Sequence, residues 1–410
     1  MRVRLARASA LRLGLLALGL FVVATNAFVI AGVLPQIAHA LGVGPATIGY
    51  SISIYAIVVA VASPLVSMTC GRVRPERVMA AGLVLIAAGT FLAAAAGTFT
   101  VFTAGRIIAA LGGAALVPSA MAAAPVMVPL PQRGRAIALV GMGFTLAMAI
   151  GSPIGTALAD IGGWRLPLSV LAGLAAVLVP ALLLMVRDVP RSAAVDLRSR
   201  AVVLRDPRIV FAIAASLLMT LAFNMVYIFS AVITHDATGG DHKRLAILLL
   251  AYGVAGVIGN VVGGRLADRI GSRRTLQIVL AAQATAFVSL IPAHGSLVAT
   301  ALVFTLSGIG GFAASVAIQY RLALIDSRHA NIALAWYSTA MYVGISIAPL
   351  IGAAALPHGV PVLLAAAAAS ILVAVIASEV SHARRRDYDG VARDQDLVCA
   401  SSTPSYPGCA

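Results

Sequence analysis

The sequence predicts an all-α integral membrane protein whose twelve transmembrane helices form two six-helix bundles. Three observations lead to this prediction. The 410-residue chain is 61% hydrophobic and only 10% charged, whereas a soluble domain carries about 25% charged residues. Nearly uncharged stretches such as 11–34, 78–96 and 360–378 have the roughly 20 residues that a helix needs to cross a hydrocarbon core. The polar segment 187–208 divides these stretches into two sets of six.

The expected spans fall into two series, separated from one another by short segments that hold most of the charges. The first bundle, residues 11–186, contains spans at about 11–34, 44–68, 77–96, 98–118, 136–158 and 165–186. The second bundle, residues 209–378, contains spans at about 209–233, 244–264, 274–292, 296–318, 330–354 and 360–378. Residues 1–10 form a cytoplasmic tail, 187–208 a cytoplasmic linker, and 379–410 a disordered cytoplasmic tail. Two similar halves predict an internal repeat, with a substrate site between them near the membrane midplane.

The positions of the basic residues predict the orientation of the chain. Most of the 29 Lys and Arg residues lie in alternate connecting segments and in the two tails. Because positively charged loops stay in the cytoplasm, we expect a cell-membrane protein with both termini cytoplasmic. A net charge of +15 would suggest nucleic acid in a soluble protein, but the sequence shows no basic face with stacking aromatic residues. We therefore expect no nucleic-acid partner.

The segment 259–274 carries the most specific motif, GNVVGGRLADRIGSRR, at the turn between the eighth and ninth expected spans. Its glycines allow close helix packing, and its acid can lie against a helix N-terminus or pair with nearby arginines. The motif resembles the signature loop of the major facilitator superfamily, a family of secondary transporters. That resemblance implies a conformational role for Gly264, Asp268, Arg269, Gly271 and Arg273. The equivalent turn of the first half, 68–77, lacks the acid.

Helix 4 contains an arginine, Arg106, in the run GRIIAALGGA. A charge at a helix centre costs roughly 2.5–3.5 kcal/mol on insertion scales, so an intramembrane arginine indicates a functional site. This run resembles the helix-4 motif of the same superfamily. The alternative is that Arg106 lies near a helix end and extends its charge to water.

Helix 5 contains Gly151, Pro153 and Gly155. Proline bends a helix because it lacks the amide donor, and small neighbours let another helix approach. The run resembles the antiporter motif of exporters, although Ala147 stands where the leading glycine is expected. A packing kink without a role in export is the alternative.

Helix 1 reads FVVATNAFVIAGVLP over 21–35. With the two halves and the PQRGRA turn at 131–136, it resembles the twelve-span drug:proton antiporter branch, particularly sugar-efflux and chloramphenicol-resistance-type permeases. The resemblance covers about residues 10–380 and implies efflux by proton antiport. Many relatives have a glutamate where this chain has Ala27.

None of the fourteen acids falls near the centre of an expected span, although proton-driven carriers usually place a carboxylate or histidine there. Antiport is therefore the leading mechanism and facilitated exchange its rival. Without a carboxylate a central site would not pair with a cation, and Arg106 would favour neutral or weakly anionic groups.

Polar and aromatic residues within the spans suit a small amphipathic ligand. The candidate substrate-binding residues are Thr25, Asn26, Tyr55, Arg106, Asn224, Tyr227, Trp336, Tyr337 and Tyr342. Asn26 and Asn224 are the strongest, because a buried amide needs a partner. For Trp336 and Tyr337 an alternative interpretation is that they are interfacial anchors.

The sequence thus predicts a monomeric secondary transporter whose partners are a small molecule, protons and the lipid bilayer. Uptake or facilitated passage of sugars or nucleosides without proton coupling is the alternative. We expect that this protein is not an enzyme, since its sequence contains no His-Glu-x-x-His, Gly-x-Ser-x-Gly or phosphate-loop motif. We expect neither cofactor nor metal, because Cys70, Cys399 and Cys409 have no zinc-site or disulfide spacing.

Overall fold

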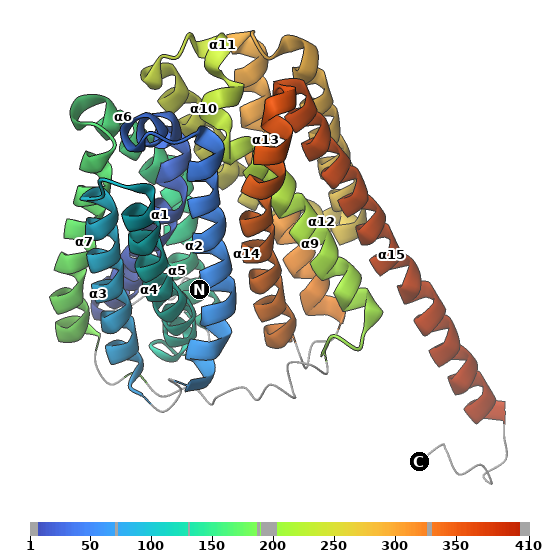
Figure 1. Cartoon of the computed structure of the whole chain (residues 1–410). Helices are drawn as coiled ribbons and strands as arrows, with labels where there is room; N and C mark the ends of the chain where they lie inside the picture. The colour runs from blue at the N-terminus through green and yellow to red at the C-terminus, as the bar shows by residue number, and fades with distance from the viewer. Residues whose placement is uncertain are drawn as a thin grey trace.

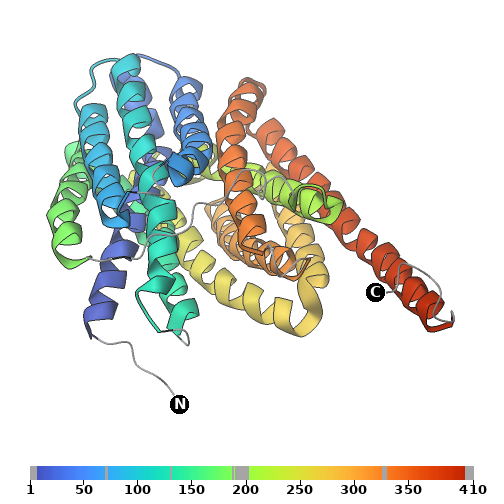
Figure 2. The same ribbon diagram turned by 90° about the horizontal axis from the view of Figure 1, so that it is seen from below.

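A computed structural model describes residues 7–69, 73–129, 132–186, 189, 203–325 and 330–401 of the chain. Every regular element in these residues is a helix. The N-terminal half consists of α1 (Arg7–Leu41), α2 (Pro45–Thr69), α3 (Pro75–Ala94), α4 (Phe99–Val126), α5 (Arg133–Leu146), η2 (Ala147–Gly151), α6 (Ser152–Gly162) and α7 (Arg165–Met185). The C-terminal half consists of α9 (Pro207–Ile228), α10 (Ser230–Ile233), α11 (His235–Thr238), α12 (His242–Ala293), α13 (Leu297–Ile325), α14 (Ala330–Ala355), η3 (Leu356–His358) and α15 (Val360–Ser401). Figures 1 and 2 show the halves side by side, with α15 extending beyond the second.

The described helices account for twelve spans. Ten are long and apolar enough to cross a membrane, and α5 and α6 together form an eleventh that is bent by 43°. Helix α12 has 52 residues, which is about 78 Å at 1.5 Å per residue and too long for one crossing. Gly271 divides it, because its backbone is not helical (φ 81°, ψ 159°). The two arms of α12 are therefore the eighth and ninth spans, and the predicted all-α membrane fold is confirmed.

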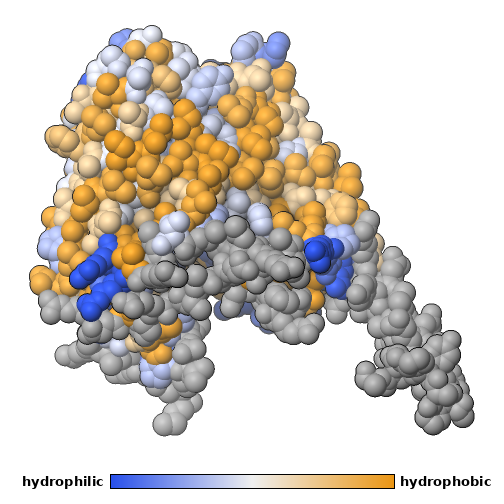
Figure 3. Space-filling model, turned by 60° about the horizontal axis from the view of Figure 1, so that its bottom comes forward, coloured by the Kyte–Doolittle hydropathy of each residue, from blue (hydrophilic) through white to orange (hydrophobic). Residues whose placement is uncertain are grey.

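The flank of the molecule is apolar, as a lipid-facing surface requires. Figure 3 shows hydrophobic residues over the side of the helices and hydrophilic residues at the lower border. Large apolar side chains point outward from several helices, including Phe91 (64% exposed), Val298 (71%) and Ile376 (62%). A soluble monomer rarely exposes apolar patches of this extent, whereas helices with internally satisfied backbones can expose them to lipid.

The bend in the fifth span coincides with the predicted Gly-Pro motif. A π-helical turn, η2, ends at Gly151, two residues before Pro153. Helix α1 packs closely along this span: a Cβ at Gly151 would lie 2.3 Å from Thr25 Oγ1, and one at Gly155 only 2.2 Å from Val29 Cγ2. Only glycine allows the two helices to approach this far.

Helix α15 differs from the expectation for the C-terminal tail. Hydropathy predicts that the last span ends at Ser378 and that 379–410 is disordered, but α15 continues to Ser401. Between these positions the chain has no proline and a single glycine, Gly390, so an established helix can propagate at low cost. Residues 402–410 lie outside the described part of the chain.

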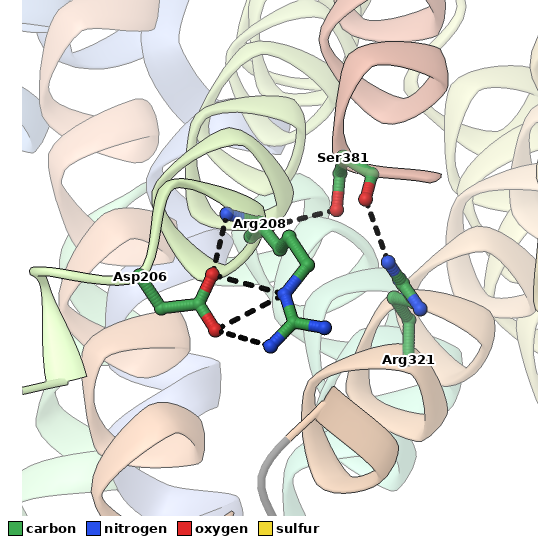
Figure 4. A network of polar contacts seen from close by, with 4 residues as sticks. All are labelled: Asp206, Arg208, Arg321 and Ser381. Atoms are coloured by element: carbon green, nitrogen blue, oxygen red, sulfur yellow. Dashed lines mark hydrogen bonds and ion pairs between the residues drawn. The ribbon is translucent and has the colours of Figure 1, made fainter. Parts of the chain in front are cut away.

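A polar network joins α15 to the beginning of the second half (Figure 4). The Asp206 carboxylate caps α9 by accepting from the Arg208 amide at 2.9 Å, and it also binds the Arg208 guanidinium at 2.8 Å. Ser381 of α15 donates its hydroxyl to the Arg208 carbonyl at 2.7 Å, while its carbonyl accepts from Arg321 of α13 at 2.6 Å. Three helices are thus joined at the end of the molecule where residues 203–206 enter α9, which we call the linker end.

Asp206 makes the stability of this end depend on pH. Burial raises the pKa of its carboxyl. The hydrogen bonds from Arg208 and the charges of Arg208 and Arg321 lower this pKa by more than burial raises it, so it lies below its ordinary value of 3.8. The stabilisation is therefore complete above the unfolded-state pKa of about 3.9 and is lost as pH falls through the folded-state value. We expect the thermal unfolding midpoint of the detergent-solubilised protein to fall below pH 4, and to fall less in Asp206→Asn. Asp268→Asn, at an exposed acid, is the control, and parallel pH curves for all three proteins would contradict the prediction.

Candidate functional site

Arg106 lies inside the N-terminal half. It is the eighth residue of α4, is only 1% exposed, and donates from Nη1 to the backbone oxygen of Asn26 at 2.6 Å and to its Oδ1 at 2.5 Å. The side chain therefore does not reach water at a helix end, which was the alternative interpretation of this position. The charge of Arg106 is therefore held at a fixed place inside the bundle by an amide on another helix, which makes it a candidate functional site.

Three more helices contribute to the surroundings of Arg106. The side-chain amide of Asn26 donates to Thr90 Oγ1 of α3, and the ring of Tyr55 on α2 lies 4.2 Å from the guanidinium carbon. An arginine over an aromatic face is stabilised by the ring quadrupole. We call Asn26, Tyr55, Thr90 and Arg106 the Arg106 cluster; α1 to α4 supply one residue each.

Thr90 is not predicted from the sequence, because its only signal is a hydroxyl beside a glycine in an apolar span. Gly89 lets α3 approach α4 so closely that a Cβ there would lie 2.4 Å from the Ala109 amide nitrogen. The next residue, Thr90, accepts from Asn26 of α1.

An aromatic cluster joins the two halves, and its Phe28 follows Asn26 by two residues on α1. Phe28 of α1 meets Tyr227 of α9 edge-on, with ring centroids 5.7 Å apart. Phe144 packs on the other side of Phe28 at 5.8 Å, and Tyr252 of α12 lies 5.0 Å from Tyr227. Of these residues only Tyr227 was a candidate from sequence, because phenylalanines are common in spans and carry no separate signal.

The remaining candidates lie in several places. Tyr342 of α14, which packs against α2, is close enough to Tyr55 to interact with it electrostatically. Thr25 packs against Gly151 rather than toward Arg106. Asn224 donates to the Thr220 carbonyl at 2.8 Å within α9, and its Oδ1 has no hydrogen-bond partner among the described residues.

Tyr337 and Trp336 are separate from the Arg106 cluster. The Tyr337 hydroxyl is hydrogen-bonded to Ser315 of α13, and Gln319 donates to the same Ser315 hydroxyl at 3.2 Å. Trp336 is half-buried on α14. The nine candidates therefore do not form one site: Asn26, Tyr55 and Arg106 come together, with Tyr342 nearby.

The loop between the arms of α12 has the predicted glycine turn but different ion pairing. Asp268 and Arg269 are exposed, and no described residue pairs with the Asp268 side chain. Arg273 pairs instead with Glu379 of α15, at 2.6 Å, and Gln277 donates to the same carboxylate at 2.8 Å. Helix α15 thus brings a carboxylate, Glu379, to Arg273 of this loop.

Contacts between the halves gather at the end opposite the linker end. Gly49, in the first turns of α2, faces Phe229 and Pro349 of the second half. At the same end His242 Nδ1 lies 3.9 Å from Asp160 Oδ1. These contacts join α2 to α14, and the fifth span to the start of α12.

Two contacts lie deeper in the same interface. A Cβ on Gly253 would lie 2.0 Å from Ala149 Cα, so α12 and η2 touch backbone to backbone. Farther along, Asn260 donates to Thr145 Oγ1 at 3.4 Å. The fifth span and α12 thus form one side of the interface between the halves.

Replacing Asn26 by leucine is expected to destabilise the protein by about 1–3 kcal/mol, the usual cost of leaving a buried hydrogen-bonding group unpaired. The volume is kept, but Arg106 Nη1 loses Oδ1 and Thr90 loses its donor. Thermal unfolding in detergent measures the effect. The matched control is Thr25→Val at the neighbouring buried residue, whose hydroxyl has no partner among the described residues. Equal midpoints for the two variants would show that the Asn26 contacts contribute nothing.

The family model of the Major Facilitator Superfamily matches residues 16–349 and 233–390, which together cover most of the chain. The chain belongs to this superfamily. It is therefore a multi-pass membrane protein of a transporter family, as the loop at 259–274 and the helix-4 motif indicated. Among the described residues no group of three His, Cys, Asp or Glu could hold a metal ion.

Two superfamily relatives match most of the chain. A chloramphenicol resistance protein of Streptomyces lividans is 29% identical over 377 residues, covering 89% of this chain and 94% of the relative. The MFS-type transporter YbcL of Bacillus subtilis is 24% identical over 338 residues, covering 82% of this chain and 87% of the relative. Both cover the two halves of the fold.

Solved structures of two other transporters show the same fold. The nucleoside transporter NupG has a TM-score of 0.75 at 13% identity, over 91% of this chain and 99% of its own. A bacterial homologue of the human lysosomal transporter Spinster, inward-facing and unoccupied, has a TM-score of 0.74 at 16% identity, over 93% and 96%. Identities this low establish the fold and not the substrate.

Proposed function

We propose that this chain exports a small, neutral or weakly anionic amphipathic compound across the cell membrane, as a monomer and in exchange for protons. The proposal rests on the aromatic cluster between the halves, in which Phe28 and Tyr227 lie 5.7 Å apart. We call this cluster the seam. Rings from opposite halves, with Asn224 and Tyr342 on the C-terminal side as candidate polar contacts, suit an amphipathic ligand. A ligand bound there would contact both halves, which alternating access requires.

The charges near the seam support the substrate class. Described acids lie toward the two ends of the bundle, such as Asp160 and Asp236 at one end and Asp206 and Asp268 at the other. Arg106 is buried in the first half. A cationic compound would meet a like charge and no carboxylate among the described residues, so neutral and weakly anionic compounds are favoured.

The same contacts support an alternating-access cycle. The linker end carries most of the positive charge, so we place it in the cytoplasm together with both termini. The halves meet at the opposite end, around Gly49 and the His242–Asp160 pair. We assign this arrangement to the conformer that is closed on the outside, and we expect Asp268 to find its partner only in the other conformer.

The similarity to a chloramphenicol resistance protein supports export, because a cell that exports a drug becomes resistant to it. The alternative is a carrier or facilitator for sugars or nucleosides that is not coupled to protons. The absence of acids from the span centres favours this alternative, and the fold of the nucleoside transporter is compatible with it.

The test uses purified protein in sealed vesicles with an imposed pH gradient and an internal pH dye. Neutral, anionic and cationic compounds are added in turn, with protein-free vesicles as the control. Collapse of the gradient by a neutral or anionic compound, only with protein present, is the expected result. Passage of labelled compound with an intact gradient would establish the uncoupled alternative, and a response limited to cations would contradict the substrate class.

A further inference from the structure

The Arg106 cluster contains more hydrogen-bond donors than acceptors. Arg106 Nη1 is satisfied twice by Asn26, but its Nε and Nη2 are buried and have no partner among the described residues. The Tyr55 hydroxyl, whose ring covers the guanidinium, is likewise buried without a partner in the described part of the chain. Buried N–H and O–H groups rarely remain unpaired in native proteins, so an acceptor is missing at this point.

No described residue accepts a hydrogen bond from these two nitrogens. The side-chain oxygen of Asn26 accepts from Arg106 Nη1 instead, and its nitrogen donates to Thr90. No described carboxylate forms an ion pair with Arg106, and none of the fourteen acids lies near the middle of a span. A buried charge without a counter-charge is costly, and a group that accepts hydrogen bonds and carries negative charge would remove both deficits.

We propose that the Arg106 cluster is a binding site for a monovalent anion, which accepts hydrogen bonds from Arg106 Nε and Nη2 and from the Tyr55 hydroxyl. A halide and a carboxylate both meet these requirements. The carboxylate could belong to the transported compound, and that version alone rests on the proposed function. The halide version requires only that the cluster exists in the folded protein.

Asn26 and Thr90 act as positioning residues for this site. They fix Nη1 on one side of the guanidinium and leave the other two nitrogens to face the anion. The planar fork of arginine binds a carboxylate through two parallel N–H donors, which a lysine cannot reproduce. Arg106→Lys should therefore weaken the response to carboxylates more than the response to halides.

The test is thermal unfolding of the purified full-length chain in detergent, at constant ionic strength, with methanesulfonate replaced by chloride or acetate. Methanesulfonate is bulkier than either anion and a much weaker hydrogen-bond acceptor, so it serves as the reference anion. Ligands that bind only the folded state raise the midpoint with the logarithm of their concentration. We expect both anions to raise the midpoint between about 5 and about 200 mM. We expect no rise in Arg106→Gln.

The matched control is Arg165→Gln. Arg165 also donates to a carbonyl, that of Ala96 at 3.0 Å, and lies 4.4 Å from an aromatic ring, that of Trp164, but it is exposed. This variant should respond as the wild type does. Identical responses of wild type and Arg106→Gln would overturn the proposal, as would a wild type insensitive to both anions.

A direct measurement covers the case in which Arg106→Gln does not fold. Equilibrium dialysis of the wild type with radioactive chloride should show saturable binding that acetate displaces, and linear uptake alone would overturn the proposal. An efflux assay then identifies the source of the anion. Competition between chloride and substrate indicates the substrate's own carboxylate, and a chloride requirement indicates a resident halide. Because unfolding and dialysis need no transport, a failure of the export proposal leaves the anion site testable.

Discussion

Replacing Arg106 by alanine is expected to abolish transport while the protein still inserts into the membrane. The substitution removes the hydrogen bonds by which α4 holds the amide of Asn26, and it removes a buried charge from the first half. Losing hydrogen bonds made by a charged group costs about 1.5–3 kcal/mol. If about 3 kcal/mol of this acts on the transport cycle, efflux falls about 100-fold.

Efflux of a compound identified by the vesicle assay measures this effect, with membrane insertion checked by the yield of folded protein in detergent. Arg165→Ala is the control, since it removes an arginine with similar contacts from an exposed position. Arg106→Lys separates charge from geometry, because a lysine keeps the charge but not the fork that binds Asn26. Normal efflux by correctly inserted Arg106→Ala would end the assignment of Arg106 to the transport site.

How far the site could be predicted depended on how visible each residue is in an apolar sequence. Arg106 is conspicuous because a charge interrupts a run of small and apolar residues. Thr90 is not, since threonines are common in spans and their hydroxyls can bond to their own helix. Phe28 and Tyr252 escaped for a related reason: their importance comes from neighbours on other helices, and sequence spacing along one helix does not reveal those neighbours.

The elements were predicted more completely than their ends and partners. Hydropathy located all twelve spans, because length and lack of charge are properties of the chain itself. It placed the end of the last span at Ser378, where the polarity changes, although α15 continues to Ser401 because helix propensity does not require apolar residues. The motif loop was located correctly, but the partner of Arg273 is Glu379, on a helix distant in sequence.

Replacing Gly253 by valine is expected to prevent the outside-closed conformer and to stop transport. Gly253 of α12 meets the backbone of η2, and a Cβ there would lie 2.0 Å from Ala149 Cα and 2.6 Å from its nitrogen. Both obstacles are backbone atoms, so no side chain can rotate away. Overpacking a tight contact costs about 1–3 kcal/mol, which changes a conformational ratio by about 5- to 150-fold.

Disulfide formation between Asp160→Cys and His242→Cys measures this ratio, because the two native side chains lie 3.9 Å apart across the halves. The background replaces Cys70, Cys399 and Cys409 with serine. We expect Gly253→Val to lower the cross-linking yield and efflux together. Gly173→Val is the control, since Gly173 is an exposed residue of α7 and a Cβ on it would meet no described atom within 4 Å. A Gly253→Val protein that cross-links and transports like the wild type would mean that the halves do not separate along α12 and η2. The moving interface would then have to lie between α2 and α14, and the seam at Phe28 and Tyr227 would not open during transport.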